Sequence, residues 1–299
     1  MEKAYYRFIG FKNTASILYI YDRFPFYYGI GTRSIRDEEL LDQGYYRTDF
    51  LTARTKVGLE KTLIQKSKLN YSLLYEYNNV KPDNKIKSIF LETTEKPIKG
   101  LGQSHLVGAE VDFKLDFRDK PNFTKNGSLL SINSKTYQGI HSNNASNKQT
   151  LFNNSEIVWA QYQTFNIGTE LTLTGRTGLL GTFGNAPFFH QTALGSNSYL
   201  RGYTRNRFLD KYVAFYNLEA RLHIGTFNTI LAPIRFGIFG FFDDGIVWGE
   251  KSYKSNKWNN AKGLGMYIAP IADVYNFNFY FAKSNDKGIY SDFKIGWRF

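Results

Sequence analysis

The sequence has no cysteine among its 299 residues, only 7 prolines, and no uncharged apolar run as long as a membrane-spanning helix. The absence of cysteine excludes structural disulfides and thiolate metal sites, and it leaves the redox compartment open. A spanning helix needs about 20 apolar residues. The longest uncharged stretch, 177–200, is interrupted by glycines, Pro187 and several Asn, Ser and Thr residues, so it is predicted to be a loop. Residues 1–7 contain no apolar h-region, so no signal peptide is predicted within the chain.

Aromatic residues and positive charge are abundant. The chain has 26 Phe and 22 Tyr, which argues against intrinsic disorder because disordered chains are poor in aromatic residues. It carries 38 Lys and Arg against 26 Asp and Glu, a formal net charge of +12. The basic residues are scattered through predicted loops and polar strand faces and form no stripe with interleaved aromatics. We therefore expect no nucleic-acid partner.

Hydrophobic alternation is the clearest local pattern. From Val107 to Arg118, apolar residues alternate with small or charged ones at every second position. The same period recurs over 69–77, where Leu74 is an exception, and over 275–282. This pattern is typical of a β-strand with one apolar and one polar face. No segment of comparable length shows helical periodicity, so the sequence predicts an all-β fold.

The lengths of the strands and connections favour a transmembrane antiparallel β-barrel over a soluble sandwich or propeller. Soluble strands commonly have about 5–6 residues, whereas membrane strands need about 9–11. The alternating run 107–118 has the length that a membrane strand needs. Short connections also alternate with long polar ones, as in outer-membrane barrels. The short connections are 65–68, 166–168 and 271–273, and the long ones are 81–104, 139–154, 178–211 and 247–261.

The last predicted strand, 289–299, ends on phenylalanine. Its alternation directs one set of side chains toward lipid: Ile289, Phe293, Ile295, Trp297 and Phe299. Phe277 and Phe279 of the preceding strand are predicted to face lipid as well, and Lys294 and Arg298 to face the lumen or its rim. A terminal aromatic on such a strand resembles the sorting signal of bacterial outer-membrane barrels. The predicted signal residues are Phe293, Ile295, Trp297 and Phe299.

Three motifs occur in order in the second half of the chain. They are Leu200-Arg201-Gly202-Tyr203 in the loop 178–211, then Glu219 in the following strand, then Phe241-Phe242-Asp243-Asp244-Gly245. This order and spacing resemble the BamA/TamA superfamily of outer-membrane assembly and secretion barrels, also called the bacterial surface antigen family. Upstream, 116–127 resembles that family's D-x-R-D-x-P-x-x-P-x-x-G turn, with Thr124 where the family often has proline. The resemblance covers 106–299 well and the preceding residues only loosely.

The resemblance implies that the long loop folds back into the lumen, where its arginine meets acidic residues on the next two strands. Alternation agrees, since it places Glu219 and Asp243 on the inward faces of their strands. A guanidinium offers five donors and suits bridging two carboxylates away from bulk water. Arg201 is therefore predicted to latch the loop. The latch residues are Leu200, Arg201, Gly202, Tyr203, Glu219, Phe241, Asp243 and Gly245.

The strand count differs from that of the family. Fourteen strands are predicted, near 3–11, 14–21, 25–33, 47–64, 68–79, 106–119, 128–138, 155–165, 169–177, 212–224, 234–245, 262–270, 275–283 and 289–299. The resemblance implies sixteen. We therefore expect 1–299 to be an outer-membrane β-barrel domain that lacks N-terminal strands and an upstream domain, such as periplasmic POTRA repeats. The alternative is that two short hairpins are fused within 33–64.

No motif for catalysis, metal binding or a cofactor is evident. His105, His141, His190 and His223 are far apart in the sequence and lack ligand spacing. Residues 195–199 lack the second glycine of a nucleophile elbow, and the chain contains no phosphate-binding loop. We expect neither enzymatic activity nor a cofactor. The isolated Gly29-Ile30-Gly31 is interpreted as a tight bend within a strand.

The resemblance implies a barrel that inserts or translocates proteins at the bacterial outer membrane. Its implied partners are unfolded outer-membrane or secreted client proteins, accessory assembly proteins, and outer-membrane lipid including lipopolysaccharide. Lysines of the loop 247–261, namely Lys251, Lys254 and Lys257, could meet lipopolysaccharide phosphates or be simply solvated. One alternative is a secretion pore for a dedicated or fused passenger protein. Another is a passive porin, which would give no reason for the Arg201 motif.

Overall fold

The computed structural model describes residues 3–8, 11–22, 26–31, 34, 36–63, 66–82, 88–92, 98–144, 150–196, 199–229, 233–249, 257–271, 275–286 and 288–297. In these ranges the chain is almost entirely β-structure. The helical elements there are the short helices α1 (Glu38–Asp42) and α2 (Ile89–Glu92) and the 3-10 turn η2 (Phe188–His190). Within the same ranges no helix has the length and apolar character that crossing a membrane requires. The predicted all-β fold is confirmed.

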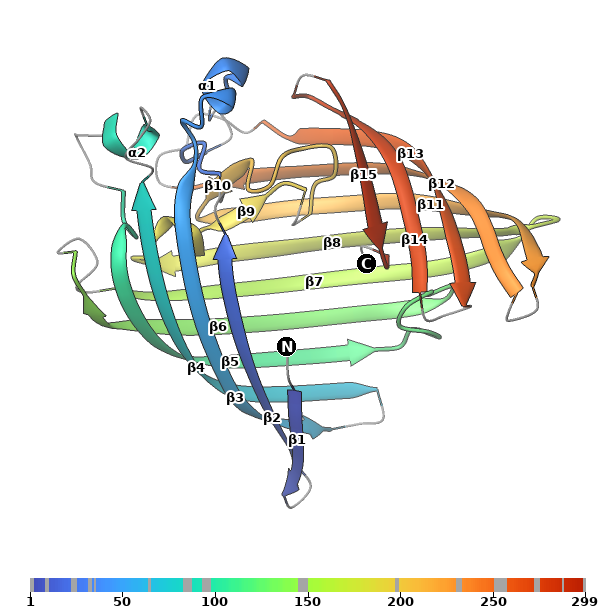
Figure 1. Ribbon diagram of the computed structural model, residues 1–299. Helices are drawn as coiled ribbons and strands as arrows, with labels where there is room; N and C mark the ends of the chain where they lie inside the picture. Colours follow the sequence, from blue (N-terminus) through green and yellow to red (C-terminus); the bar gives the residue numbers. More distant parts are fainter. Residues whose placement is uncertain are drawn as a thin grey trace.

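Thirteen strands form one antiparallel sheet (Figure 1). In order across the sheet they are β1 (Lys3–Phe8), β2 (Phe11–Asp22), β3 (Thr48–Thr62), β4 (Ser67–Pro82), β5 (Gly102–Asp116), β6 (Gly127–Ser142), β7 (Leu151–Asn166), β8 (Glu170–Gly184), β11 (Tyr212–Asn228), β12 (Pro233–Trp248), β13 (Asn259–Ile271), β14 (Tyr275–Ser284) and β15 (Ile289–Ile295). Every strand lies next to its neighbour in sequence except at β8, which pairs with β11. Among the described residues, β1 and β15 are the two edges.

The segment between β8 and β11 forms a small hairpin of its own on the concave side of the sheet (Figure 1). Its strands are β9 (Thr192–Leu194) and β10 (Phe208–Asp210), paired with Leu194 opposite Phe208. We call residues 185–211 the internal loop. Because β9 packs against β8, β11 and β12, the loop lies against the wall formed by these strands.

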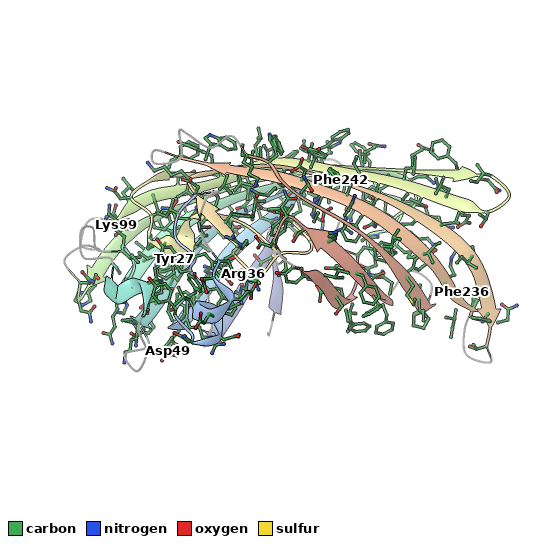
Figure 2. All side chains as sticks on the ribbon, turned by 90° about the horizontal axis from the view of Figure 1, so that it is seen from above. Tyr27, Arg36, Asp49, Lys99, Phe236 and Phe242 are labelled. Carbon is green, nitrogen blue, oxygen red and sulfur yellow. The ribbon has the colours of Figure 1, made fainter. Side chains whose placement is uncertain are left out.

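The two faces of the sheet differ as the alternation predicts. On β4, Tyr71 and Leu73 are 50% and 72% exposed, whereas Leu74 and Glu76 are buried. Apolar side chains thus line the convex face, and buried polar side chains line the concave face together with the packed loops. Figure 2 shows Tyr27 and Arg36 within the concavity and Phe242 on the convex side. This is the inside-out arrangement of a membrane barrel, in which the polar side faces the lumen.

One predicted strand, 25–33, is wrong. The described residues 26–31 form no strand and lie inside the concavity. Tyr27 and Tyr28 are consecutive and both buried, so period two is broken there. Gly29 and Gly31 have φ angles of +93° and +100°, which interrupt the extended conformation that a continuous strand needs. The segment instead bonds to the internal loop, where the N–H of Gly31 donates to the carbonyl oxygen of Leu209 at 2.7 Å.

The prediction that Trp297 faces lipid is also wrong. β15 ends at Ile295, and Gly296 has a φ angle of +86°, which turns the chain away from the strand path. The centroid of the Trp297 ring lies 5.3 Å from that of Tyr267 and 5.6 Å from that of Phe239. Tyr267 and Phe239 are both buried on the inner face. Alternation holds only while the chain stays extended, so it fails at the residue after the bend.

The other side-chain directions predicted for the last two strands are confirmed. Phe279 and Phe293 are 36% and 59% exposed on the outer face, and Phe277 stacks on Phe293. Lys294 points inward and lines a small cavity with Arg201 and other inner residues. Ile289 and Ile295 are exposed on the outer face as well. The predictions for Arg298 and Phe299 concern residues outside the described ranges, as do those for Lys251 and Lys254.

Candidate functional site

Apolar packing positions the internal loop. Its side chains form a buried cluster with inward-facing residues of β11, β12 and β13; the members are Leu194, Leu200, Tyr203, Phe208, Val213, Phe215, Val247 and Ala261. Fully burying one such large apolar side chain contributes roughly 1.5–3 kcal/mol, whereas fixing one backbone residue costs about 1–2 kcal/mol. These two terms are of similar size over a loop with many small residues, so we expect specific polar contacts to help keep the loop ordered.

Arg201 supplies the most buried of these contacts. Its Nε and Nη2 donate to the two carboxylate oxygens of Asp243, each at 2.7 Å, and its backbone N–H donates to Asp243 Oδ2 at 3.0 Å. Its Nη1 donates to Glu219 Oε2. Arg201, Glu219 and Asp243 are 2%, 5% and 0% exposed. The structure therefore brings together the three charged residues that the motifs single out, while their role as a latch remains a prediction.

The surroundings of Arg201 keep it charged. Burial alone would lower the pKa of its guanidinium, but the charges of Asp243 and Glu219 outweigh this and raise the pKa above its usual range. The ring of Phe241 lies 3.7 Å from the guanidinium carbon and covers one of its faces. The aromatic ring holds the guanidinium perpendicular to its plane, and the carboxylates hold it within that plane.

Sequence reasoning missed a second arginine in this cluster. Arg221 Nε donates to Glu219 Oε1 at 2.7 Å, so Glu219 lies between two guanidinium groups. The guanidinium carbon of Arg221 is 3.8 Å from the Trp297 ring. Alternation places Arg221 on the inward face, two residues after Glu219, so the sequence did carry a signal that Arg221 lies near the cluster. The position of Trp297 could not be found in this way because it depends on the bend at Gly296.

The Phe241-x-Asp243-x-Gly245 motif acts as one inward-facing row of β12. Phe241 stacks on Arg201, and Asp243 binds its guanidinium. At Gly245, an added Cβ would lie 2.8 Å from a Leu194 methyl carbon of the internal loop. Phe241 therefore gives the internal loop a ring to stack on, Asp243 gives it a negative charge to bind, and Gly245 leaves space for its Leu194 side chain.

The residues around Arg201 reach further strands. Gly202 has a φ angle of +77°, and a Cβ there would lie 3.0 Å from Ala282 Cβ on β14. The Tyr203 hydroxyl donates to the Asn260 carbonyl oxygen at 2.9 Å and accepts from the Asn285 N–H at 3.2 Å. Leu200 is fully buried. The tip of the loop thus contacts β11, β12, β13 and β14 together.

Comparison with known proteins agrees with this geometry. The profile of the Omp85 superfamily domain matches residues 21–299. The chain belongs to the Omp85 superfamily. Its fold is similar to the crystal structure of BamA from Haemophilus ducreyi lacking POTRA domains 1-3, with a TM-score of 0.66 and 14% identity over 96% of this chain and 58% of the BamA chain. The chain thus spans less than two thirds of that BamA chain. No curated protein matches the sequence.

Membership in the Omp85 superfamily confirms the predicted resemblance and the barrel fold, and it places the chain in the bacterial outer membrane. The apolar convex face then contacts lipid, and the concave face with the Arg201 cluster is the lumen side. The long connections lie on the external side and the short ones on the periplasmic side. By this assignment the internal loop enters the lumen from outside.

A second ion-pair cluster joins the first part of this Omp85 domain to its last hairpin. Arg207 of the internal loop binds Asp286, between β14 and β15, with Nε–Oδ2 and Nη2–Oδ1 distances of 2.7 and 3.3 Å. Arg207 Nη1 also donates to Ser34 Oγ at 2.9 Å, and Arg36 bonds to the Tyr290 hydroxyl. These contacts could not be read from the sequence, because they depend on the inward positions of Ser34 and Arg36.

The segment resembling the family turn adopts a compact form. Arg118 binds the Asp116 carboxylate through Nε and Nη2 at 2.9 and 2.8 Å and donates to the Pro121 carbonyl oxygen at 3.1 Å. Thr124, at the position where proline is frequent, donates its hydroxyl to the Lys120 carbonyl oxygen at 2.7 Å. Phe123 projects from the turn into the lumen, 6.1 Å from the Trp297 ring.

The histidines are closer to one another than the sequence suggests. His105 and His141, although far apart in the sequence, are opposite each other on β5 and β6, with ring centroids 5.6 Å apart. His190 instead bonds to Glu76 Oε1 at 2.8 Å. In the part of the chain that the structure describes, no three His, Asp or Glu residues are grouped as metal ligands.

Proposed function

We propose that this chain is the membrane barrel of a protein that inserts client proteins into the bacterial outer membrane. The proposal is supported by its membership in the Omp85 superfamily and by its fold, which is similar to that of BamA. The observation that carries it is the combination of a firmly anchored loop beside β11–β14 with an adjacent sheet edge at β15. The barrel needs no covalent chemistry for this work.

The edge of β15 offers the means of insertion. In the described part of the chain β15 pairs only with β14, over seven residue pairs from Phe277–Ile295 to Lys283–Ile289. Each unpaired backbone group in hydrocarbon costs several kcal/mol. A client strand that adds to the β15 edge would satisfy these groups, as in other cases of β-strand addition. Strand addition at this edge is therefore favourable without any energy source.

The anchored loop gives the edge a rigid support. Arg201, Gly202 and Tyr203 connect the loop to β11, β12, β13 and β14, which are the strands behind β15. In the proposed mechanism this group of strands holds its shape while the β15 edge accepts a client strand. Release of the loop would loosen the strands and slow insertion.

The absence of cysteine makes a direct test possible. Ser291, exposed on β15, is replaced by Cys and labelled with a photoreactive maleimide in the full-length protein in bilayer vesicles. The matched control is Gln163→Cys, exposed on β7 within the sheet. A urea-unfolded eight-stranded outer-membrane barrel protein is the client. We expect adducts from position 291 and few from 163 during folding. Equal yields at the two positions would contradict the proposal.

Depletion of the protein in its own bacterium separates insertion from secretion. Insertion predicts that many outer-membrane proteins decrease together. The loss of a single exported protein, with the other barrels unchanged, would instead assign the chain to a dedicated secretion pore.

A further inference from the structure

The outward face of β6, β7 and β8 carries a furrow. Three small residues lie in register on these strands, with Ser134 opposite Ser155 and Ser155 opposite Gly181. Adjacent strands are about 4.8 Å apart, so the three positions form a trough about 10 Å long across the strands. The space has a volume of about 370 Å³.

Apolar side chains border the furrow on one side and at its end. The neighbouring outward row, also in register, consists of Ile132, Ile157 and Leu179. At the end, the rings of Phe183, Tyr212 and Trp248 follow one another with centroid separations of 5.6 and 5.7 Å. A Cβ on Gly181 would lie 2.8 Å from the Phe183 ring, so the ring covers this glycine. The trough is thus closed by aromatic groups.

The other border is polar and uncharged. Asn153 Nδ2 donates to Ser134 Oγ and to Thr136 Oγ1, each at 2.9 Å, and Ser155 Oγ donates to Asn153 Oδ1 at 2.6 Å. The hydroxyl oxygens of Ser134 and Ser155 are 3.0 Å apart. Among the described residues, no acceptor is found for the hydroxyl hydrogen of Thr136. Thr136 can therefore donate a hydrogen bond outward.

A polar border such as this one is unusual on the lipid-facing surface of a membrane protein. Polar groups that face hydrocarbon are costly unless they are bonded, and those that occur there tend to have a function. The furrow is continuous with the lipid-contacting belt of the barrel. Its aromatic end lies where β8 ends at Gly184 and β11 begins at Tyr212, which is the external end of both strands. Its surroundings are therefore the external leaflet.

We propose that the furrow binds an acyl chain of the lipid A part of lipopolysaccharide. An apolar trough fits a hydrocarbon chain, and an adjacent row of neutral hydroxyl and amide groups fits a chain that carries hydroxyl and amide groups near its attachment. Lipid A has such hydroxyacyl chains, whereas the chains of a glycerophospholipid carry only an ester at one end. The inference depends on the membrane location and not on the proposed insertion activity.

Photolabelling tests the site. Full-length protein in bilayer vesicles is irradiated with lipid A that carries a diazirine on a hydroxyacyl chain, and the labelled peptides are identified by mass spectrometry. We expect peptides containing 132–136, 153–157 and 179–183 to be labelled about fivefold more than the β4 peptide containing Tyr71 and Leu73, which corresponds to about 1 kcal/mol of preference. Even labelling of the outer face would overturn the proposal.

Two variants separate the site from general lipid contact. Ser155→Leu fills the trough, and we expect labelling there to fall about fivefold, as a lost preference of about 1 kcal/mol implies. The control Gly175→Leu adds the same side chain elsewhere on the outer face, where the nearest atom to an added Cβ is a Leu218 carbon at 3.7 Å, and should leave labelling unchanged. Unchanged labelling in Ser155→Leu would overturn the proposal.

A milder variant and a second lipid test the choice of ligand. Thr136→Val removes the outward hydroxyl and with it one acceptor of Asn153 Nδ2, which still donates to Ser134 Oγ. The variant should lower labelling by lipid A without affecting a diazirine phosphatidylethanolamine of equal chain length. If the phosphatidylethanolamine labels the furrow as strongly as lipid A does, or if Thr136→Val leaves lipid A labelling unchanged, the assignment to lipid A is wrong.

Discussion

Asp243 accepts three hydrogen bonds from one residue, because Nε, Nη2 and the backbone N–H of Arg201 all donate to its carboxylate. Both residues are almost completely buried. A carboxylate held in this way is stable only while its partner remains, since a buried charge without a partner is strongly unfavourable. We therefore expect the order of the internal loop to be sensitive to single substitutions at these two residues.

Arg201→Ala is expected to release the internal loop while the barrel remains in the membrane. Breaking a buried pair on one side costs about 3–5 kcal/mol, because Asp243 then stays buried without its guanidinium. Glu219 is less affected because Arg221 still binds it. Limited proteolysis of 185–211 and client insertion are the measurements. Arg201→Lys should restore protection only in part, since an ammonium lacks the planar fork.

The neighbouring carboxylate provides the control for this prediction. Asp243→Asn should release the loop, whereas Asp244→Asn should not, because Asp244 bonds to the Tyr216 hydroxyl and to the Gly245 N–H and not to Arg201. If the loop stays protected and insertion is unchanged in both Arg201→Ala and Asp243→Asn, the latch idea is wrong and the motif is a packing feature.

Arg207 and Asp286 are expected to be energetically coupled. Their side chains are 7% and 15% exposed, and they join the internal loop to the last hairpin. A double-mutant cycle with alanine at each position should give a coupling energy of roughly 0.5–3 kcal/mol for a direct contact. Thermal unfolding in detergent provides the free energies. The pair Arg36–Glu38, whose carboxylate is 55% exposed, should couple more weakly, and a larger value there would contradict the assignment.

Gly202→Ala is expected to destabilise the loop more than Gly288→Ala does. Both glycines have positive φ angles, +77° and +101°, so each substitution costs about 1–2 kcal/mol of backbone strain. At Gly202 the new methyl would also meet Ala282 Cβ at 3.0 Å, whereas nothing lies within 4 Å of a Cβ at Gly288. Loop proteolysis should reveal the difference. Adding Ala282→Gly should partly reverse the effect, and its failure to do so would contradict the contact.

Trp297 is expected to be shielded from lipid and Trp159 to be accessible. Trp159 is 48% exposed on the outer face of β7, whereas Trp297 packs against Phe239 and Tyr267 inside. Single-tryptophan variants, with the other tryptophans replaced by Phe, allow each fluorescence signal to be measured in vesicles of brominated lipid. Quenching should be strong for Trp159 and weak for Trp297. Strong quenching of Trp297 would restore the lipid-facing assignment from alternation.

The sequence alone determined most of the strands of the large sheet and which side of each faces lipid, since a period of two assigns every residue of an extended segment to one face. For this reason the inward directions of Glu219 and Asp243 were predictable, and with them their access to Arg201. Alternation says nothing where the chain leaves the strand conformation. The positive φ angles at Gly29, Gly31 and Gly296 therefore separate prediction from structure at the segment 25–33 and at Trp297.

Tertiary structure alone decided the relationships between strands. The furrow exists because Ser134, Ser155 and Gly181 come into register on three strands, and register depends on the pairing of whole strands and not on any local pattern. The contact of Arg207 with Asp286 depends likewise on a loop that folds back over a distance of 79 residues in the chain. A side chain's direction is fixed by its nearest neighbours in sequence, whereas its contacts are fixed by chain segments far from it.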